Sequence, residues 1–319
     1  MTAADIGVTV MSVTDIERHI MEYFVTGASG WIGTAVTAEL LQHGHEVVGL
    51  ARNDESAAKL SAAGAHVFRG SIDDADGLRA PAEAADGVIH LAFNHDFSAH
   101  AAAAEADRAV ITALGETLAG SDRPLIVPSG VLGLGNGVDV ATERTEFDLA
   151  KTASPRLPNG KLALDFADRG VRVVSVRFAP TVHGDGDHGF MAGYVAMDRL
   201  AGVAGFMGDG SQTWPAVHVA DAAVLVRLAL EKAPAGSVLH AVADEGVEHR
   251  AIADVMGEKL GLPVRAFEPD EIPEQWAWLA RFLGFGSRAS STATQELLGW
   301  TPTHNTLLED LAAGYYTER

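Results

Sequence analysis

The feature that most constrains the fold of this chain is a glycine-rich octapeptide at residues 26–33, TGASGWIG. It follows a short apolar run, Tyr23-Phe24-Val25, and precedes a helical pattern that runs to about Gln42. Glycines let the backbone turn tightly and approach a phosphate, and the start of a helix offers free N–H groups with a partial positive charge. Strand, turn and helix stand in the order that a dinucleotide-binding fingerprint requires. The sequence therefore predicts a nucleotide phosphate site in this turn.

The composition of the chain excludes several classes of protein. It has 319 residues, a formal net charge of −20 and no cysteine. An acidic surface repels phosphate backbones, so we expect no nucleic-acid partner, and disulfides and thiolate metal sites are excluded. No apolar run approaches the roughly 18 residues that a membrane span needs. We therefore expect a cytoplasmic protein that acts on a small molecule and does not bind membranes.

Residues 1–20 form a separate segment before the first strand. They carry Asp5, Asp15 and Glu17 and lack the basic start and the continuous apolar centre of a signal peptide. Nucleotide-binding domains of this kind usually begin close to their first strand. We therefore expect residues 1–20 to be an N-terminal extension that the fold does not need.

Apolar runs alternate with helical patterns as far as about residue 178, which is typical of an α/β protein with a parallel sheet covered on both faces. We expect further strands at 45–51, 65–70, 87–92, 125–128 and 171–177, and helices at 54–63, 74–83, 98–119 and 159–169. From about residue 179 the pattern becomes irregular, and aromatic residues cluster at Trp276, Trp278, Phe282 and Phe285. Ordinary core packing is the favoured interpretation of that cluster, with a lid over an apolar substrate as the alternative.

Several separated motifs, taken in order, resemble the extended short-chain dehydrogenases/reductases, the group that also holds sugar-nucleotide epimerases and dehydratases. Besides the glycine-rich turn, they are VIHLA at 88–92, PSG at 128–130, RFAPTVHG at 177–184, VHVAD at 217–221 and LGWTP at 298–302. The resemblance implies a doubly wound Rossmann sheet over residues 21–178 and a smaller α/β substrate-binding region over 179–319, with some elements returning to the sheet. It also implies bound NAD(P) and a homodimer formed through the helices at about 98–119 and 159–169.

The resemblance also implies which residues hold the cofactor. They are Gly27, Ser29, Gly30, Trp31, Ile32, Gly33, Arg52, Asn53, Ser71, Ile72, Leu91, Ala92, Phe93, Lys161, Pro180 and Val182. Residues 91–93 would lie under the pyrophosphate and the nicotinamide ribose. Ser71 stands where the family usually has an acid beside the adenine, which indicates an altered adenine contact.

The end of the second strand indicates which dinucleotide is bound. Folds that prefer NAD place an acid there, on the ribose hydroxyls of the adenosine. This chain has Ala51, followed by Arg52 and Asn53. Arginine offers a charged fork to a 2′-phosphate, and no acid at Ala51 repels it. We therefore expect NADP(H) to be preferred, with NAD(H) as the alternative.

The catalytic set that the resemblance implies is incomplete. The family normally uses a serine at the carbonyl oxygen, a tyrosine as proton donor, and a lysine four residues later that holds the nicotinamide ribose. Ser129 fits the serine position and Lys161 the lysine position, but Leu157 stands where the tyrosine belongs. The chain has four tyrosines, none between the fifth and sixth strands: Tyr23, Tyr194, Tyr315 and Tyr316. The alternative lysine, Lys151, is preceded at the same spacing by Phe147.

A proton must therefore come from another group if the protein reduces a carbonyl. The candidates are His183, which replaces the more usual tyrosine after the sixth strand, Tyr194, His95, and a water held by Ser129. The sequence HGDGDH at 183–188 matches no metal-binding template, so no metal site is expected. His218 and Asp221 recur in the family at the start of a helix, and we interpret them as structural.

Three hypotheses for the function follow. The first is an NADP(H)-dependent oxidoreductase with a modified active site that reduces a small, partly apolar carbonyl compound or a related C=N or C=C bond. The second is an NAD(P)-binding sensor or regulator without catalysis, which the missing tyrosine favours. The third is a lyase or isomerase that keeps the fold and uses other acids and bases. The sequence does not identify the substrate.

Overall fold

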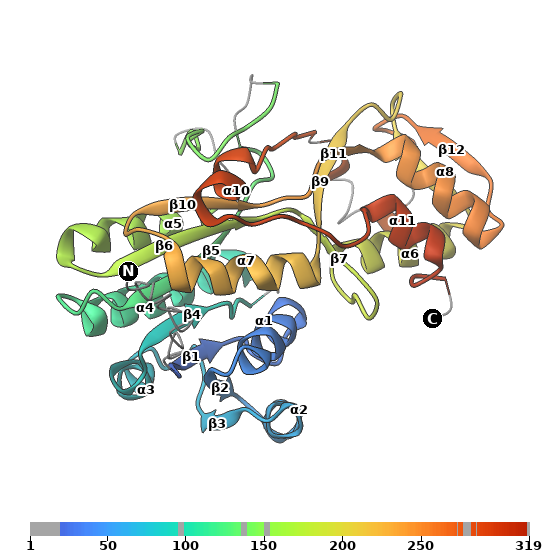
Figure 1. Cartoon of the computed structure of the whole chain (residues 1–319). Coiled ribbons are helices and arrows are strands. Elements are labelled where there is room, and N and C mark those ends of the chain that lie inside the picture. Colours follow the sequence, from blue (N-terminus) through green and yellow to red (C-terminus); the bar gives the residue numbers. More distant parts are fainter. Residues whose placement is uncertain are drawn as a thin grey trace, which may run out of the picture.

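The computed structural model describes residues 20–94, 99–134, 139–149, 154–272, 274–276, 282–284 and 286–317. Most of the expected N-terminal extension lies outside the described residues, and so do His95, Lys151, Trp278 and Phe285. The described chain forms a large sheet covered by helices, with a smaller lobe at one end of it (Figure 1).

A seven-stranded sheet positions the glycine-rich turn. Its order is β10-β6-β5-β4-β1-β2-β3, and every neighbouring pair is parallel. The strands are β1 (Glu22–Thr26), β2 (Glu46–Ala51), β3 (His66–Arg69), β4 (Gly87–His90), β5 (Pro124–Gly130), β6 (Arg172–Phe178) and β10 (Ser237–Ala241). The strand order reverses between β1 and β4, and in such sheets the crevice at that switch point binds ligands. The expected α/β Rossmann fold is confirmed.

Helices cover both faces of this sheet (Figure 1). On one face α1 (Trp31–Gln42) packs against α7 (Val219–Lys232). On the other face lie α3 (Arg79–Ala84), α4 (His100–Leu118) and α5 (Leu157–Leu164), while α2 (Asp54–Ala63) follows β2. Each face has its own apolar core, represented by Leu40 on the first and Leu114 on the second. This burial on both sides explains why the strands read as nearly continuous apolar runs.

Two helices differ from their expected form. The helix expected at 159–169 is α-helical only to Leu164 and continues as a 3₁₀ helix over Asp165–Arg169. The helix expected at 74–83 begins with a 3₁₀ turn at Asp76–Leu78 before α3. A 3₁₀ turn is a common way to tighten the end of a short helix, and residue periodicity does not distinguish it from α-helix.

The smaller lobe has a mixed three-stranded sheet of β7 (Thr181–His183), β9 (Thr213–His218) and β11 (Asp244–Glu248), and a parallel pair of β8 (Ala204–Met207) and β12 (Val264–Phe267). Its helices are α6 (Phe190–Ala201), α8 (His249–Leu260) and α11 (Leu307–Ala313), with a 3₁₀ turn at Glu274–Trp276. Helix α10 (Thr292–Leu298) packs instead on the large sheet, against β10 and α7. Trp276 is fully buried against Tyr194 and Phe267. This part of the aromatic cluster is therefore core packing.

Asp221 ties the chain's last segment to the first turn of α7. Its carboxylate accepts hydrogen bonds from the backbone N–H groups of Thr303 and His304, each at 3.0 Å, and its carbonyl oxygen accepts one from the indole of Trp300. His218 caps α7 by accepting from the N–H of Ala220. Both His218 and Asp221 thus make the structural contacts that the sequence predicts.

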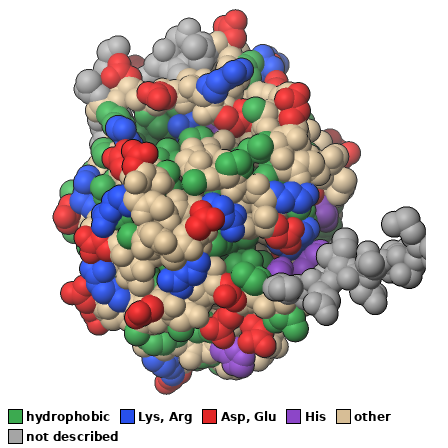
Figure 2. All heavy atoms as spheres, turned by 60° about the vertical axis from the view of Figure 1, so that its left-hand side comes forward, with side chains coloured by type: hydrophobic (Ala, Val, Ile, Leu, Met, Phe, Trp, Pro, Cys, Tyr) green, Lys and Arg blue, Asp and Glu red, His purple; other side chains and the backbone are tan. Residues whose placement is uncertain are grey.

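The charged side chains do not separate by sign on the face drawn in Figure 2, where acidic and basic groups stand side by side. Arg79, for example, pairs with Asp76 and with Glu116 at 2.9 Å each. None of the helices in the described part of the chain is long and apolar enough to cross a membrane.

Asp198 makes the stability of the smaller lobe dependent on pH. This carboxyl on α6 is fully buried, and burial raises its pKa to about 8 from the ordinary 3.8. The folded protein therefore holds a proton that the unfolded chain has lost between those two pH values. We expect the free energy of unfolding to fall across that range, by up to about 1.4 kcal/mol per pH unit for one proton. Asp198→Asn should flatten this slope in urea unfolding at pH 5, 7 and 9.

The control for this slope is Asp209→Asn, because Asp209 is exposed and accepts hydrogen bonds from Ser211. In the Asp209→Asn variant, the free energy of unfolding should still fall between pH 5 and pH 9, as in the wild type. An unchanged slope in the Asp198→Asn variant would show that Asp198 is not the group that binds the proton.

Candidate functional site

The glycine-rich turn lies between β1 and α1, and its backbone geometry requires glycine. Gly27 has a φ of +70°, and a Cβ there would lie 2.6 Å from the amide nitrogen of Ala92. A Cβ on Gly33 would lie 2.0 Å from the carbonyl oxygen of Gly27. Helix α1 follows Gly30, so no side chain caps its first N–H groups. A tight turn with an uncapped helix start fits a pyrophosphate. Ser29 is half-buried in the turn, and Ile32 packs partly against the core.

Trp31 joins this turn to the smaller lobe. Its indole Nε1 donates a hydrogen bond to the carbonyl oxygen of Val182 in β7 at 2.7 Å. Its ring also meets the edge of His188, with the ring centroids 5.8 Å apart. Pro180, which precedes β7, is half-buried. The contact brings Val182 next to the turn, although the two lie far apart in sequence.

An arginine follows the end of β2, and no ion pair joins it to an acid in the part of the chain that the structure describes. Ala51 is buried, and Arg52 is exposed beside it. Asn53 caps α2, where its side chain accepts from the N–H of Ser56 at 2.8 Å. The nearest acid in sequence, Asp54, pairs with Arg69 at the end of β3. Arg52 is thus an exposed cation at the carboxyl end of β2.

The loop after β3 holds the remaining residues predicted at the adenine. The Ser71 hydroxyl donates to the carboxylate of Asp73 at 2.8 Å, and it also accepts from the N–H of Asp73. Ile72 is half-buried and packs against the core on the α4 side of the sheet. Both residues lie one strand beyond β2, on the same side of β1 as Arg52.

A buried polar network connects the turn to α4. The N–H groups of Leu91 and Ala92 donate to the backbone and side-chain oxygens of Thr26, at 3.1 and 3.2 Å. The Thr26 hydroxyl lies 2.7 Å from Nδ1 of His90, and His90 Nε2 lies 3.3 Å from Asp107 in α4. Because a carboxylate only accepts, His90 Nε2 donates to Asp107, and the network is continuous from the glycine-rich turn to α4.

Asp107 extends the network to the helix that follows β5. Its second oxygen accepts from the Asn159 side chain at 2.7 Å, and Arg156 lies 3.8 Å from its first. Burial alone would raise the pKa of Asp107, but the hydrogen bond and charge of His90 and the charge of Arg156 outweigh it and hold that pKa below its ordinary value. Asp107 is therefore an anion that positions residues on β4 and α5 together.

Ser129 lies at the carboxyl end of β5, two strands from the glycine-rich turn. Helix α5 passes close to it, because a Cβ on Gly160 would lie 3.6 Å from the Ser129 hydroxyl oxygen. The next residue, Lys161, has a side chain that is 70% exposed, and its ammonium lies 3.5 Å from Asp165 on its own helix. The structure thus places Ser129 as predicted from its strand, and it does not bring Lys161 to the same side of α5.

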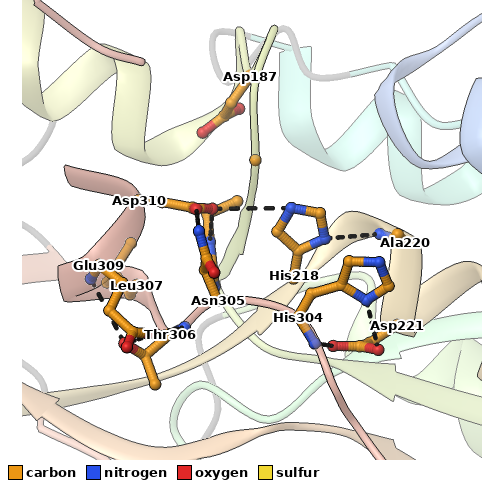
Figure 3. Close-up of polar contacts among 12 residues, drawn as sticks. Asp187, His218, Ala220, Asp221, His304, Asn305, Thr306, Leu307, Glu309 and Asp310 are labelled. Carbon is orange, nitrogen blue, oxygen red and sulfur yellow. Dashed lines mark hydrogen bonds and ion pairs between the residues drawn. The ribbon is translucent and has the colours of Figure 1, made fainter. Parts of the chain in front are cut away.

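His183 lies in the core of the smaller lobe rather than on an open surface. Its side chain is fully buried, and Nδ1 donates to Asp310 of α11 at 2.7 Å. His218 and Asn305 also face the Asp310 carboxylate, at 3.8 and 3.0 Å (Figure 3). Burial would raise the pKa of Asp310, but these partners lower it below its ordinary value. His183 is therefore enclosed by protein and cannot meet a substrate in this conformation.

Tyr194 is likewise enclosed. It is 1% exposed, and its hydroxyl donates to the carbonyl oxygen of Gly205. Burial raises its pKa well above the ordinary value of 10. Two candidate proton sources from the sequence analysis remain. His95 lies outside the described residues, and Ser129, which could hold a water, is half-buried at the end of β5.

Sequence reasoning missed Arg156. Its guanidinium carbon lies 3.8 Å from the centroid of the Phe93 ring, directly after β4. Its Nε is buried without a hydrogen-bond partner. Arg156 precedes Gly160 by one helical turn, so both lie on the face of α5 near Ser129. Its partner Asp107 is distant in sequence, and no local pattern indicates their contact.

The strand order, the switch point and the glycine-rich turn define a nucleotide-binding α/β protein. Comparison with known proteins agrees: the model of the NAD dependent epimerase/dehydratase family matches residues 23–119. An uncharacterised protein of Schizosaccharomyces pombe is 45% identical over 296 residues, covering 93% of this chain and 100% of that protein. One of Saccharomyces cerevisiae is 40% identical over 297 residues, covering 92% and 99%. The chain belongs to the NAD-dependent epimerase/dehydratase family.

More distant relatives have named activities. A sterol-4-alpha-carboxylate 3-dehydrogenase (decarboxylating) of Dictyostelium discoideum is 25% identical over 71% of this chain and 73% of its own. A ketoreductase of a farnesyl dihydroquinoline oxide from Stigmatella aurantiaca is 27% identical over 83% and 80%. The UDP-glucose 4-epimerase structure from Thermotoga maritima, with UDP-glucose, has a TM-score of 0.72 at 20% identity and covers 92% of this chain and 97% of that one. This structural similarity shows the fold.

Proposed function

We propose that this protein is an NADP(H)-dependent oxidoreductase that reduces a small, partly apolar carbonyl compound or a related C=N or C=C bond. The observation that carries the proposal is the position of Ser129 at the carboxyl end of β5, on the same edge of the sheet as the glycine-rich turn and two strands from it. The two relatives with named activities, a dehydrogenase and a ketoreductase, support it. A sterol and a farnesyl compound are largely apolar, which supports a partly apolar substrate.

The cofactor, when bound, supplies the hydride. The residues at 26–33 hold its pyrophosphate, and Arg52 meets its 2′-phosphate. The Ser129 hydroxyl donates a hydrogen bond to the carbonyl oxygen and stabilises the negative charge that develops there. Since His183 and Tyr194 are enclosed, the proton reaches that oxygen from a water held by Ser129 or from His95. The homodimer that the family resemblance implies, through α4 and α5, stays a proposal.

The direct test is the oxidation of NADPH and NADH, followed by absorbance, over a panel of ketones, aldehydes, imines and conjugated alkenes. We expect net NADPH consumption with at least one apolar carbonyl compound. Cofactor binding without consumption over the panel favours the sensor or regulator. Substrate turnover without net consumption favours the lyase or isomerase.

Arg52 should determine the preference for NADPH. Arg52→Ala removes the exposed guanidinium at the end of β2, and we expect the Kd for NADPH to rise about 10- to 100-fold, the effect of a lost charge-assisted contact. The Kd for NADH should change little, because NADH has no 2′-phosphate. Isothermal titration calorimetry with both dinucleotides measures this difference. Arg265→Ala, which removes another exposed arginine from β12, should alter neither Kd, and an equal rise for both dinucleotides in Arg52→Ala would refute the assignment.

A further inference from the structure

Among the described residues, no lysine ammonium lies at the position where the family resemblance places one. A lysine on the helix after the fifth strand normally holds the hydroxyls of the nicotinamide ribose. Lys161 has the matching sequence position, but its side chain is 70% exposed and its ammonium pairs with Asp165 on the same helix. Gly160, not Lys161, is the residue of α5 that faces Ser129.

Arg156 occupies the inner side of α5 instead. It stands one helical turn before Gly160 and therefore on the same face of α5. Its guanidinium carbon lies over the Phe93 ring, 3.8 Å from the ring centroid. Phe93 closes the sequence LAF at 91–93, which follows β4 and is predicted to lie under the nicotinamide ribose. Arg156 and Ser129 thus border the same end of β4 and β5.

The contacts of Arg156 leave it with hydrogen-bonding capacity. Its Nε is buried and has no hydrogen-bond partner among the residues that the structure describes. Its ion pair with Asp107 is long, at 3.8 Å, and the two oxygens of Asp107 already accept from His90 and Asn159. A buried N–H without a partner costs about 1–3 kcal/mol, so a donor in this state is normally explained by a ligand, an ion or a water. Stacking on Phe93 and the Asp107 charge hold the guanidinium in place for that ligand.

We propose that Arg156, rather than Lys161, donates hydrogen bonds to the hydroxyls of the ribose next to the nicotinamide. This inference rests on the proposed function, because it requires that the crevice binds a nicotinamide dinucleotide. The network Thr26–His90–Asp107–Arg156 then joins the two ends of the cofactor site: Thr26 opens the glycine-rich turn, and Arg156 holds the opposite ribose. An arginine in this role binds and orients the ribose.

Three probes, measured by isothermal titration calorimetry on the full chain, locate the contact. NADPH contains the nicotinamide ribose, 2′-phospho-ADP-ribose contains that ribose without the nicotinamide, and 2′,5′-ADP contains neither. We expect Arg156→Gln to raise the Kd about tenfold for the first two probes, as for one lost charge-assisted hydrogen bond, and to leave the Kd for 2′,5′-ADP unchanged. Unchanged binding of 2′,5′-ADP also shows that the variant is folded.

Control variants separate this role from general effects. Arg108→Gln removes an arginine from the outer side of α4, where its side chain is 41% exposed, and should change no Kd. Lys161→Ala should also leave all three Kd values unchanged. A tenfold rise for NADPH in Lys161→Ala, or equal binding of NADPH by the wild type and Arg156→Gln, overturns the proposal. The lysine variant decides the question even where Arg156→Gln fails to fold, because Lys161 lies on the exposed face of its helix.

The wild-type protein separates this inference from the proposed function. If it binds NADH and not NADPH, only the cofactor preference is wrong, and the same comparison is made with NADH, ADP-ribose and ADP. If it binds neither dinucleotide, the proposed function fails and the inference about Arg156 fails with it.

Discussion

Gly33→Ala is expected to weaken NADPH binding strongly and to destabilise the fold. The added Cβ would lie 2.0 Å from the carbonyl oxygen of Gly27 and 2.7 Å from its carbonyl carbon. Both are backbone atoms of the tight turn, so no side chain can rotate away to make room. The turn must open, or the start of α1 must move away from β1. Either change displaces the N–H groups that fit a pyrophosphate.

The size of this effect follows from the cost of overpacking, which is typically about 1–3 kcal/mol. If this free energy is lost from binding, the Kd for NADPH rises by up to about 100-fold. The Kd rises further if the N–H groups of the turn no longer point toward the same phosphate. Calorimetric titration with NADPH and a thermal unfolding scan measure the two effects. We expect both to change, because the same atoms form the turn and begin the helix.

Gly130→Ala is the matched control for the added methyl group. Gly130 ends β5, and a Cβ there would meet only the carbonyl oxygen of Phe178, at an ordinary contact distance of 3.8 Å. The stability of the Gly130→Ala variant and its Kd for NADPH should stay near those of the wild type. If Gly33→Ala binds NADPH as well as Gly130→Ala does, the glycine-rich turn is not the phosphate site.

Local chemistry explains why much of the fold can be predicted from the sequence. Helix α2 has the predicted limits because each end carries its own signal. Asn53 accepts from an N–H of the first turn, and Gly64 adopts a left-handed φ of +89° after the last turn. The apolar runs similarly predict six of the seven strands of the large sheet, since both of its faces are buried. The seventh, β10, lies in the part of the chain after residue 179 and is not among the predicted strands.

The orientation of side chains at the site could not be predicted in the same way. Residues that follow one another on a helix point about 100° apart. The sequence therefore places Lys161 on the correct helix, while the packing of α5 on α4 decides that Gly160 faces Ser129. That packing depends on Asp107, which holds both Asn159 and Arg156.

Contacts between distant parts of the chain limit the prediction further. His183 resembles a proton donor when its position after the sixth strand is considered alone. Its partner Asp310 comes from the last helix, and the pairing encloses both side chains completely. In the same way, Trp276 is buried in the core by contacts with Tyr194 from α6 and Phe267 from β12. These pairings arise only when the smaller lobe folds around its own core.

Ser129→Ala should reduce the rate of carbonyl reduction about 100-fold or more, while the Kd for NADPH stays unchanged. Loss of one preorganised donor at a developing oxyanion costs about 10²–10³ in kcat, and this chain has no tyrosine at the family's position to share that charge. The hydroxyl is half-buried at the end of β5, and its removal leaves a cavity no larger than one oxygen atom. The fold should therefore be retained.

The measurement uses a carbonyl compound that the wild type reduces, with steady-state rates and NADPH titrations on both proteins. Ser129→Thr keeps the hydroxyl and should recover part of the rate, whereas Ser61→Ala, on the exposed side of α2, should leave the rate unchanged. Undiminished reduction by Ser129→Ala would mean that the carbonyl does not bind at the end of β5. A parallel loss of NADPH affinity would instead assign Ser129 to the cofactor, and the group that stabilises the carbonyl oxygen would then have to be sought on the inner face of α5, where Arg156 lies.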